Sequence, residues 1–182
     1  MNKLVIAISS VLALGAATSA QAQTGLITFN GEVTAVTCEV TFPGAGGTAD
    51  NPVVTLPKVA ATSLTAAGQT AGKTPVTLQV GSAATPCTAA TVALELNPSR
   101  NAQVNGAGRL LNTLTVDNAT NVTVGLRDGN DQAINLATPW SSARIAPVAG
   151  IVSIPFAAEY NAEGAATAGQ VSSNVQYTID YN

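Results

Sequence analysis

Short runs of alternating apolar and polar residues, separated by turn-forming residues, dominate this sequence of 182 residues. A period of two places successive side chains on opposite faces of a β-strand, whereas a helix needs apolar residues three and four positions apart. The helical spacing is nearly absent from the chain. The sequence therefore predicts an all-β fold in which about eight or nine strands form a sandwich or a barrel.

The expected strands are rich in Val, Thr, Ile and Leu and are bounded by Gly, Pro, Asn or Asp. The apolar parity switches within Leu26 to Phe42, so this stretch is interpreted as two strands that meet near Ala35. The remaining expected strands are 53–57, 75–80, 91–96, 110–116, 121–126, 151–160 and 171–181. Asp128 to Asp131 is expected as a tight turn, and 60–67 as a surface excursion with at most one helical turn.

The first residues have the three-part layout of a secretory signal peptide. Lys3 supplies the positive charge, Leu4 to Ala17 is weakly polar to apolar, and Ala20-Gln21-Ala22 is a small-residue cleavage site. We expect cleavage after Ala22 and an exported mature chain of about 160 residues, which suits a single domain.

Charged residues make up only 9% of the chain, against about 25% in an average globular protein. No basic cluster is present, so nucleic acid is not expected as a partner. A surface so poor in charge has little to prevent association with copies of itself.

The chain contains no histidine, which removes the commonest general base and most catalytic zinc sites. The carboxylates are scattered, and Asp128 to Asp131 lacks the downstream glutamate of a calcium loop. We therefore expect no enzyme activity, no cofactor and no metal site. The two cysteines of an exported chain, Cys38 and Cys87, are expected to form a disulfide, and Trp140 is expected to anchor a packed loop.

The two ends of the mature chain each place apolar residues on one face of a strand. At the N-terminus this face contains Gly25, Ile27, Phe29, Gly31 and Val33, so that two glycines leave gaps in it. At the C-terminus it contains Val171, Val175, Tyr177, Ile179 and Tyr181. The pattern alone fits equally well the first and last strands of an ordinary, self-complete sandwich.

Several segments, in order along the mature chain, resemble the major pilins of type 1-like fimbriae, which the chaperone–usher pathway assembles. They are Gly31-Glu32-Val33 before Cys38, the second cysteine Cys87, and the segments 124–128, 156–160 and 164–169, followed by a last strand with penultimate Tyr181. Each segment is a weak signal alone, and their combination in this order is specific.

The resemblance implies an incomplete immunoglobulin-like β-sandwich over residues 35–182, completed by a donor strand from a neighbouring subunit. Residues 23–34 would be the donor-strand extension, with Gly25, Ile27, Phe29, Gly31 and Val33 facing the acceptor groove and Gly31 at a shallow position. Residues 171–181 would border the groove and be bound by a periplasmic chaperone.

The function implied is that of a structural subunit of an extracellular fimbria that supports adhesion. Its partners would be other copies of the chain, the chaperone and an outer-membrane usher. A self-complete secreted binding module and a minor adaptor or terminator pilin are the alternatives.

Overall fold

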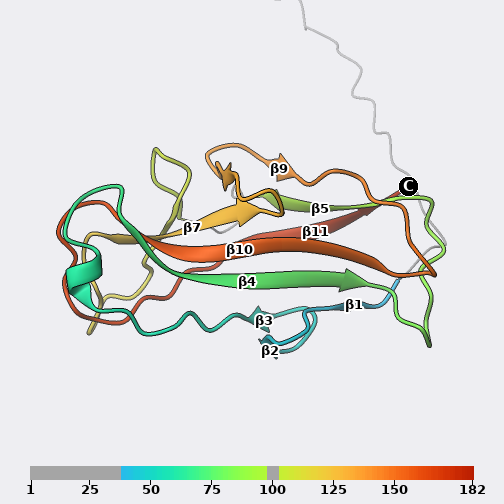
Figure 1. The fold of residues 1–182 in the computed structure, drawn as a ribbon, viewed down its shortest axis with the longest axis horizontal. Helices are drawn as coiled ribbons and strands as arrows, with labels where there is room; N and C mark the ends of the chain where they lie inside the picture. The colour runs from blue at the N-terminus through green and yellow to red at the C-terminus, as the bar shows by residue number, and fades with distance from the viewer. Residues whose placement is uncertain (1–37, 98–102) are drawn as a thin grey trace, which may run out of the picture. The chain divides into compact units, whose positions relative to one another are not determined.

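The computed structural model describes residues 38–97 and 103–182, drawn in colour in Figure 1. The predicted signal peptide and the predicted donor strand therefore lie outside the described residues. Within the described ranges the one helical element is a single 3-10 turn, η1 (Ala61–Ser63), which lies in the predicted surface excursion. None of the described segments forms a helix long and apolar enough to cross a membrane.

Six antiparallel strands form the larger sheet, in the order β1-β4-β10-β7-β6 with β8 paired to β7. Their bounds are Val40–Thr41 (β1), Thr70–Val80 (β4), Leu110–Leu111 (β6), Val122–Asp128 (β7), Ala133–Ile134 (β8) and Val152–Ala162 (β10). The 11-residue strands β4 and β10 pair along almost their whole length and form the centre of this sheet.

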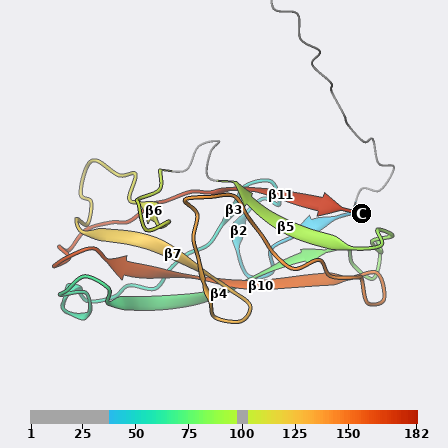
Figure 2. The same cartoon turned by 90° about the horizontal axis from the view of Figure 1, so that it is seen from above.

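Three antiparallel strands form the smaller sheet, in the order β11-β5-β9. Their bounds are Val92–Asn97 (β5), Trp140–Ser141 (β9) and Gln176–Tyr181 (β11). A separate two-stranded hairpin joins β2 (Gly46–Gly47) to β3 (Pro52–Val53). Figure 2 shows β11 and β5 in one layer, with β4 and β10 in the other.

One hydrophobic core lies between the two sheets and takes side chains from both. Leu78 of β4, Val152 of β10 and Leu94 of β5 are at most 1% exposed and belong to the same cluster. These residues occupy alternate positions of their strands, as the period of two requires. The predicted all-β sandwich is confirmed. A second, smaller cluster around Leu64 and Ala162 packs the η1 segment onto the sheet.

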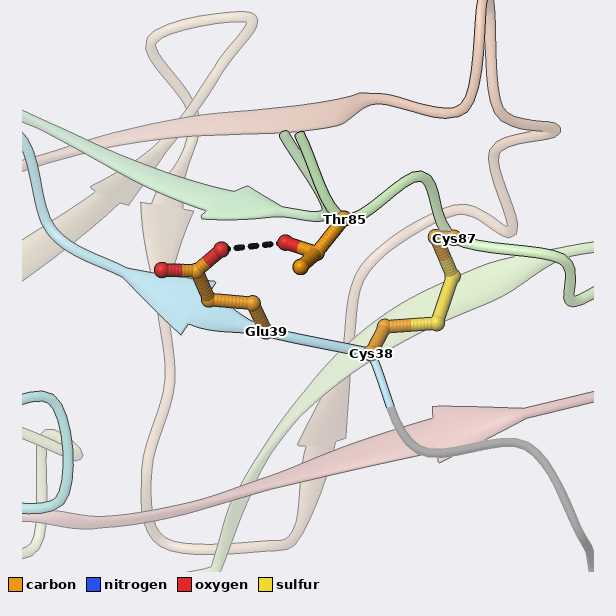
Figure 3. Close-up of a disulfide and its surroundings, with 4 residues drawn as sticks. All are labelled: Cys38, Glu39, Thr85 and Cys87. Atoms are coloured by element: carbon orange, nitrogen blue, oxygen red, sulfur yellow. Dashed lines mark hydrogen bonds between the residues drawn. A yellow bond between two sulfur atoms is a disulfide. The ribbon is translucent and has the colours of Figure 1, made fainter. Parts of the chain in front are cut away.

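The predicted disulfide is present between Cys38 and Cys87, whose Cα atoms are 5.0 Å apart (Figure 3). It ties the segment that enters β1 to the loop that precedes β5. The carboxylate of Glu39 adds to this junction, because it accepts hydrogen bonds from the hydroxyls of Thr85 and Ser82. These two bonds hold the pKa of Glu39 below its usual value, and the bond from Thr85 has the larger effect.

Several strand predictions are confirmed in place, and others are too long. The predicted turn after β7 is confirmed: the Asp128 carboxylate accepts hydrogen bonds from the backbone N–H groups of Asn130 (2.9 Å) and Gln132 (2.8 Å). The predicted strand 110–116 is wrong beyond Leu111, because the amide of Asn112 bonds the carbonyls of Ala119 and Gln170 and so replaces a ladder with a loop.

Two other boundaries also shift. The predicted strand 53–57 is limited to β3. The predicted strand 171–181 begins only at Gln176, because Ser172 bonds Asn112 and Thr113 instead of a neighbouring strand. The two-residue strands β2, β8 and β9 were not expected. Trp140 is half-buried against the core, as predicted for a packed anchor, and begins β9.

We predict that replacing Cys38 and Cys87 with serine lowers the free energy of unfolding by about 4 kcal/mol, because the disulfide closes a loop with a sequence separation of 49 residues. Urea unfolding followed by the fluorescence of the sole tryptophan, Trp140, measures the change. An unchanged midpoint in the double-serine variant would show that the disulfide does not stabilise the domain.

A second prediction concerns acid stability. Partial burial alone raises the pKa of Glu163, but hydrogen bonds from Thr123 (2.8 Å), Arg109 (2.9 Å) and Asn105 (2.9 Å) outweigh it and lower this pKa. A carboxylate whose pKa is lower in the folded than in the unfolded state stabilises the fold at pH values above its unfolded pKa of about 4.3. This contribution is lost as the pH falls through the pKa of the folded state.

Glu163→Gln is therefore expected to be less stable than the wild type at neutral pH and to approach it as the pH falls below about 4. Urea midpoints at a series of pH values provide the measurement. A difference between the two proteins that stays constant down to acid pH would contradict the assignment.

Candidate functional site

Each of the two sheets ends on one side in a strand with only one described neighbour. In the larger sheet β1 pairs with β4 alone, and in the smaller sheet β11 pairs with β5 alone, among the strands that the structure describes. An edge strand presents a row of unpaired backbone groups to which another strand can add.

The two edges lie on the same side of the domain. The rings of Phe42, just after β1, and Tyr177 of β11 meet edge to face with centroids 5.3 Å apart. The Tyr181 hydroxyl hydrogen-bonds with the backbone of Cys38, just before β1. Since the chain runs from 38 to 42 as β11 runs back from 181 to 177, the two edges are antiparallel to each other.

The hydrophobic core is left partly uncovered along the β11 edge. Val92, Leu94 and Leu96 of β5 are 0–3% exposed. Their direct cross-strand partners on β11 lie on the same face of the sheet yet are only half-buried. These partners are Tyr181, Ile179 and Tyr177.

The β1 edge of the larger sheet shows the same gradient. Val80 of β4 is 0% exposed and lies between Val152 of β10, 1% exposed, and Val40 of β1, which is only half-buried. On the opposite side of the sandwich Leu110, Ile134 and Leu136 are 0–4% exposed. The core is therefore closed on one side and open between β1 and β11.

The backbone groups of β11 can be oriented from the bonds that its neighbour β5 makes. Val92 exchanges both backbone hydrogen bonds with Ile145, and the carbonyl of Leu94 accepts one from Ser142. The backbone groups of Val92 and Leu94 therefore point away from β11. In an antiparallel ladder, two directly opposite residues either both point their backbone N–H and C=O groups toward each other or both point them away.

It follows that Ile179 and Tyr181, which are opposite Leu94 and Val92, direct their own N–H and C=O groups to the free edge. Tyr177 does the same by alternation. These three residues thus combine half-buried apolar side chains with backbone donors and acceptors that no described strand engages. This arrangement can receive an extended segment that adds to the sheet and fills the open side of the core.

Burial is the main cause that raises the pKa of Tyr177 and of Tyr181 above the usual value of a phenol. The Tyr177 hydroxyl donates to the carbonyl of Ala49 at 2.6 Å. No group of three His, Cys, Asp or Glu side chains within 38–97 and 103–182 is arranged to hold a metal ion.

The structure brings together part of the residue set predicted from the C-terminal pattern. Tyr177, Ile179 and Tyr181 lie on β11, whereas Val171 and Val175 precede it and pack partly against the core. Gly25, Ile27, Phe29, Gly31 and Val33 lie outside the described residues. Sequence reasoning did not find Phe42 as the ring opposite Tyr177, although its parity with Cys38 and Val40 was visible.

Known proteins that are similar to this chain are fimbrial proteins. A family model described as "Fimbrial protein" matches residues 27–182. The chain is 38% identical to the major fimbrial subunit SMF-1 of Stenotrophomonas maltophilia, over 90% of this chain and 96% of the relative. It is 35% identical to the F17 fimbrial protein of Escherichia coli, over 96% of both chains.

Among solved structures, the P pilus rod subunit PapA aligns with a TM-score of 0.56 and 12% identity, over 80% of this chain and 99% of the other. A chaperone–usher pilus subunit aligns with a TM-score of 0.56 and 13% identity, over 88% and 96%. These likenesses show that the two-sheet arrangement is the immunoglobulin-like pilin fold.

The chain belongs to the fimbrial protein family. It is a structural subunit of an extracellular fimbria, which is a polymer of such subunits, and it is not an enzyme.

The orientation of β11 predicts a pattern of amide exchange in the unassembled mature chain. The amides of Tyr177, Ile179 and Tyr181 face the free edge and should exchange with solvent roughly tenfold or more faster than those of Thr178 and Asp180, which face β5. Hydrogen–deuterium exchange followed by NMR measures each amide. Equal protection at alternate positions would mean that this edge is already paired.

Proposed function

We propose that the subunit polymerises by donor-strand exchange, with residues 23–34 of one chain added to the β11 edge of the next. The observation that carries this proposal is the contrast between β5, whose inward side chains are buried, and β11, whose directly opposite side chains are half-buried. A strand laid along β11 would cover these side chains and bond the outward-facing backbone groups.

The predicted donor has the length and pattern that this edge needs. Gly25 to Val33 spans nine residues, more than the six of β11, and its odd positions form one apolar face. Ile27, Phe29 and Val33 would enter the core at about 1.5–3 kcal/mol each, or roughly 5–9 kcal/mol as an upper range. Gly31 would take the position where the site is shallow.

Strand direction favours a donor from another chain over self-insertion. A donor that folds back onto its own domain would reach β1 through residues 34–37 and so run antiparallel to β1. Because β1 and β11 run in opposite directions, that donor would be parallel to β11. A neighbour's strand has no such tether and can pair antiparallel, which is the slightly more stable arrangement.

The same exposed edge requires protection before assembly, because an uncovered core and an unpaired strand promote aggregation. We assign this role to a periplasmic chaperone bound along β11, and assembly at the outer membrane to an usher. Residues 1–22 would be the signal peptide that delivers the chain to the periplasm, and residues 35–182 the sandwich domain.

Gly31→Arg tests the donor assignment. An arginine on the inserted face would place a bulky charge against the open core, so fibres should be lost while the amount of chaperone-bound subunit stays near normal. Electron microscopy of cells that express the subunit with its chaperone and usher measures the fibres, and purification of the periplasmic complex measures capture.

Asn30→Arg is the matched control, because it adds the same side chain to the opposite face of the predicted donor strand. It should assemble. Long fibres from Gly31→Arg, or equal loss from both variants, would overturn the assignment. A mature chain that stays monomeric and melts cooperatively without a chaperone would instead support a self-complete sandwich.

A further inference from the structure

The β2–β3 hairpin crosses from the β1 side of the domain to β11 at one end of the open edge. It begins just after Phe42, and the carbonyl of Ala49 at its tip accepts the hydrogen bond from the Tyr177 hydroxyl at 2.6 Å. The Asp50 carboxylate lies close enough to contribute to the raised pKa of Tyr177, after burial. The tip therefore bridges the two sheet edges at the position of Tyr177.

The hairpin itself is held weakly. Its ladder consists of two residue pairs, Gly46 with Val53 and Gly47 with Pro52, and its turn is closed by two bonds of 3.2 Å between Thr48 and Asn51. The residues from Gly46 to Asn51 are all exposed. An element with so little buried surface opens locally at low free-energy cost.

The tip is bonded to the side chain of a residue with which an inserted strand must pair. Such a strand must bond the N–H and C=O of Tyr177 at the free edge and direct a side chain between β11 and the β1 side. The Tyr177 side chain occupies that space together with Phe42, and the tip is fastened to its hydroxyl. An inserted side chain must enter this space, and the bond that holds the Tyr177 ring to the tip opposes the rearrangement.

We propose that the β2–β3 hairpin is a latch on the Tyr177 end of the acceptor edge, and that the bond from Tyr177 to Ala49 slows donor-strand insertion. This inference rests on the donor-strand function proposed above. The latch is closed in the chain without a donor and open after insertion. The bond thus controls the rate of subunit addition without contributing to the stability of the loaded domain.

The test uses the mature chain refolded from denaturant without the chaperone and kept dilute, so that the β11 edge is unoccupied when the donor is added. A fluorescein-labelled synthetic peptide of residues 25–33 is added in excess, and fluorescence anisotropy follows its uptake. Tyr177→Phe keeps the ring against Phe42 and removes only the hydroxyl. It should take up the peptide about two- to tenfold faster than the wild type, the range that one net hydrogen bond supplies.

Tyr160→Phe is the matched control, because it removes a tyrosine hydroxyl from β10, where the ring packs against the smaller cluster around Leu64 and Ala162 and lies outside the acceptor edge. Its uptake rate should stay within about twofold of the wild type. A second variant replaces Thr48–Asn51 with an Asn-Gly turn, which shortens the hairpin and keeps β2 and β3. It should accelerate uptake as much as Tyr177→Phe.

The double variant separates a shared contact from two independent effects. If the hairpin tip and the hydroxyl act through one bond, a variant that carries both changes should take up the peptide no faster than either single variant. The melting temperature of the peptide-loaded Tyr177→Phe chain should equal that of the loaded wild type, whereas a purely structural tyrosine would lower it.

The outcomes are distinguishable. Uptake by the wild type with an unchanged rate in Tyr177→Phe overturns the latch and leaves donor-strand exchange standing. Equal acceleration by Tyr177→Phe and Tyr160→Phe also overturns it. No uptake of the peptide by the wild type overturns both the latch and the proposed function.

Discussion

The open side of the core between β1 and β11 is the constraint on which the rest of the molecule depends. A sandwich of this size is stabilised by apolar side chains buried between its sheets, and here the inward residues of both edge strands remain half-buried. Tyr177, Ile179 and Tyr181 also hold backbone groups outward that the described strands leave unengaged. One added strand would cover these side chains and bond these backbone groups at the same time.

The disulfide gains a second role in this setting. It holds Cys38 beside the loop before β5, while the Tyr181 hydroxyl bonds the backbone at the same residue. Cys38, at which the first described segment begins, is therefore held at the C-terminal end of β11. Glu39, bonded to Thr85 and Ser82, reinforces this attachment.

Much of the fold was predictable from the period of two and the turn residues. The strands β4, β5, β7 and β10 lie where Val, Leu and Ile alternate with polar residues, and the disulfide followed from two cysteines in an exported chain. The boundaries after Leu111 and before Gln176 were not predictable, because Asn112 bonds residues about 60 positions away. A side-chain amide that substitutes for a ladder leaves no periodic signal in the sequence.

The candidate site divides in the same way. The sequence by itself determined which residues are apolar, which parity they share and that the chain can be stapled by one disulfide, because these are properties of neighbouring positions. Only the tertiary structure decided that β1 and β11 end their sheets on the same side, that Phe42 meets Tyr177, and that the hairpin tip reaches the Tyr177 hydroxyl. Those contacts join residues as far apart in the sequence as Phe42 and Tyr177, and their geometry follows from how two sheets pack, not from any local pattern.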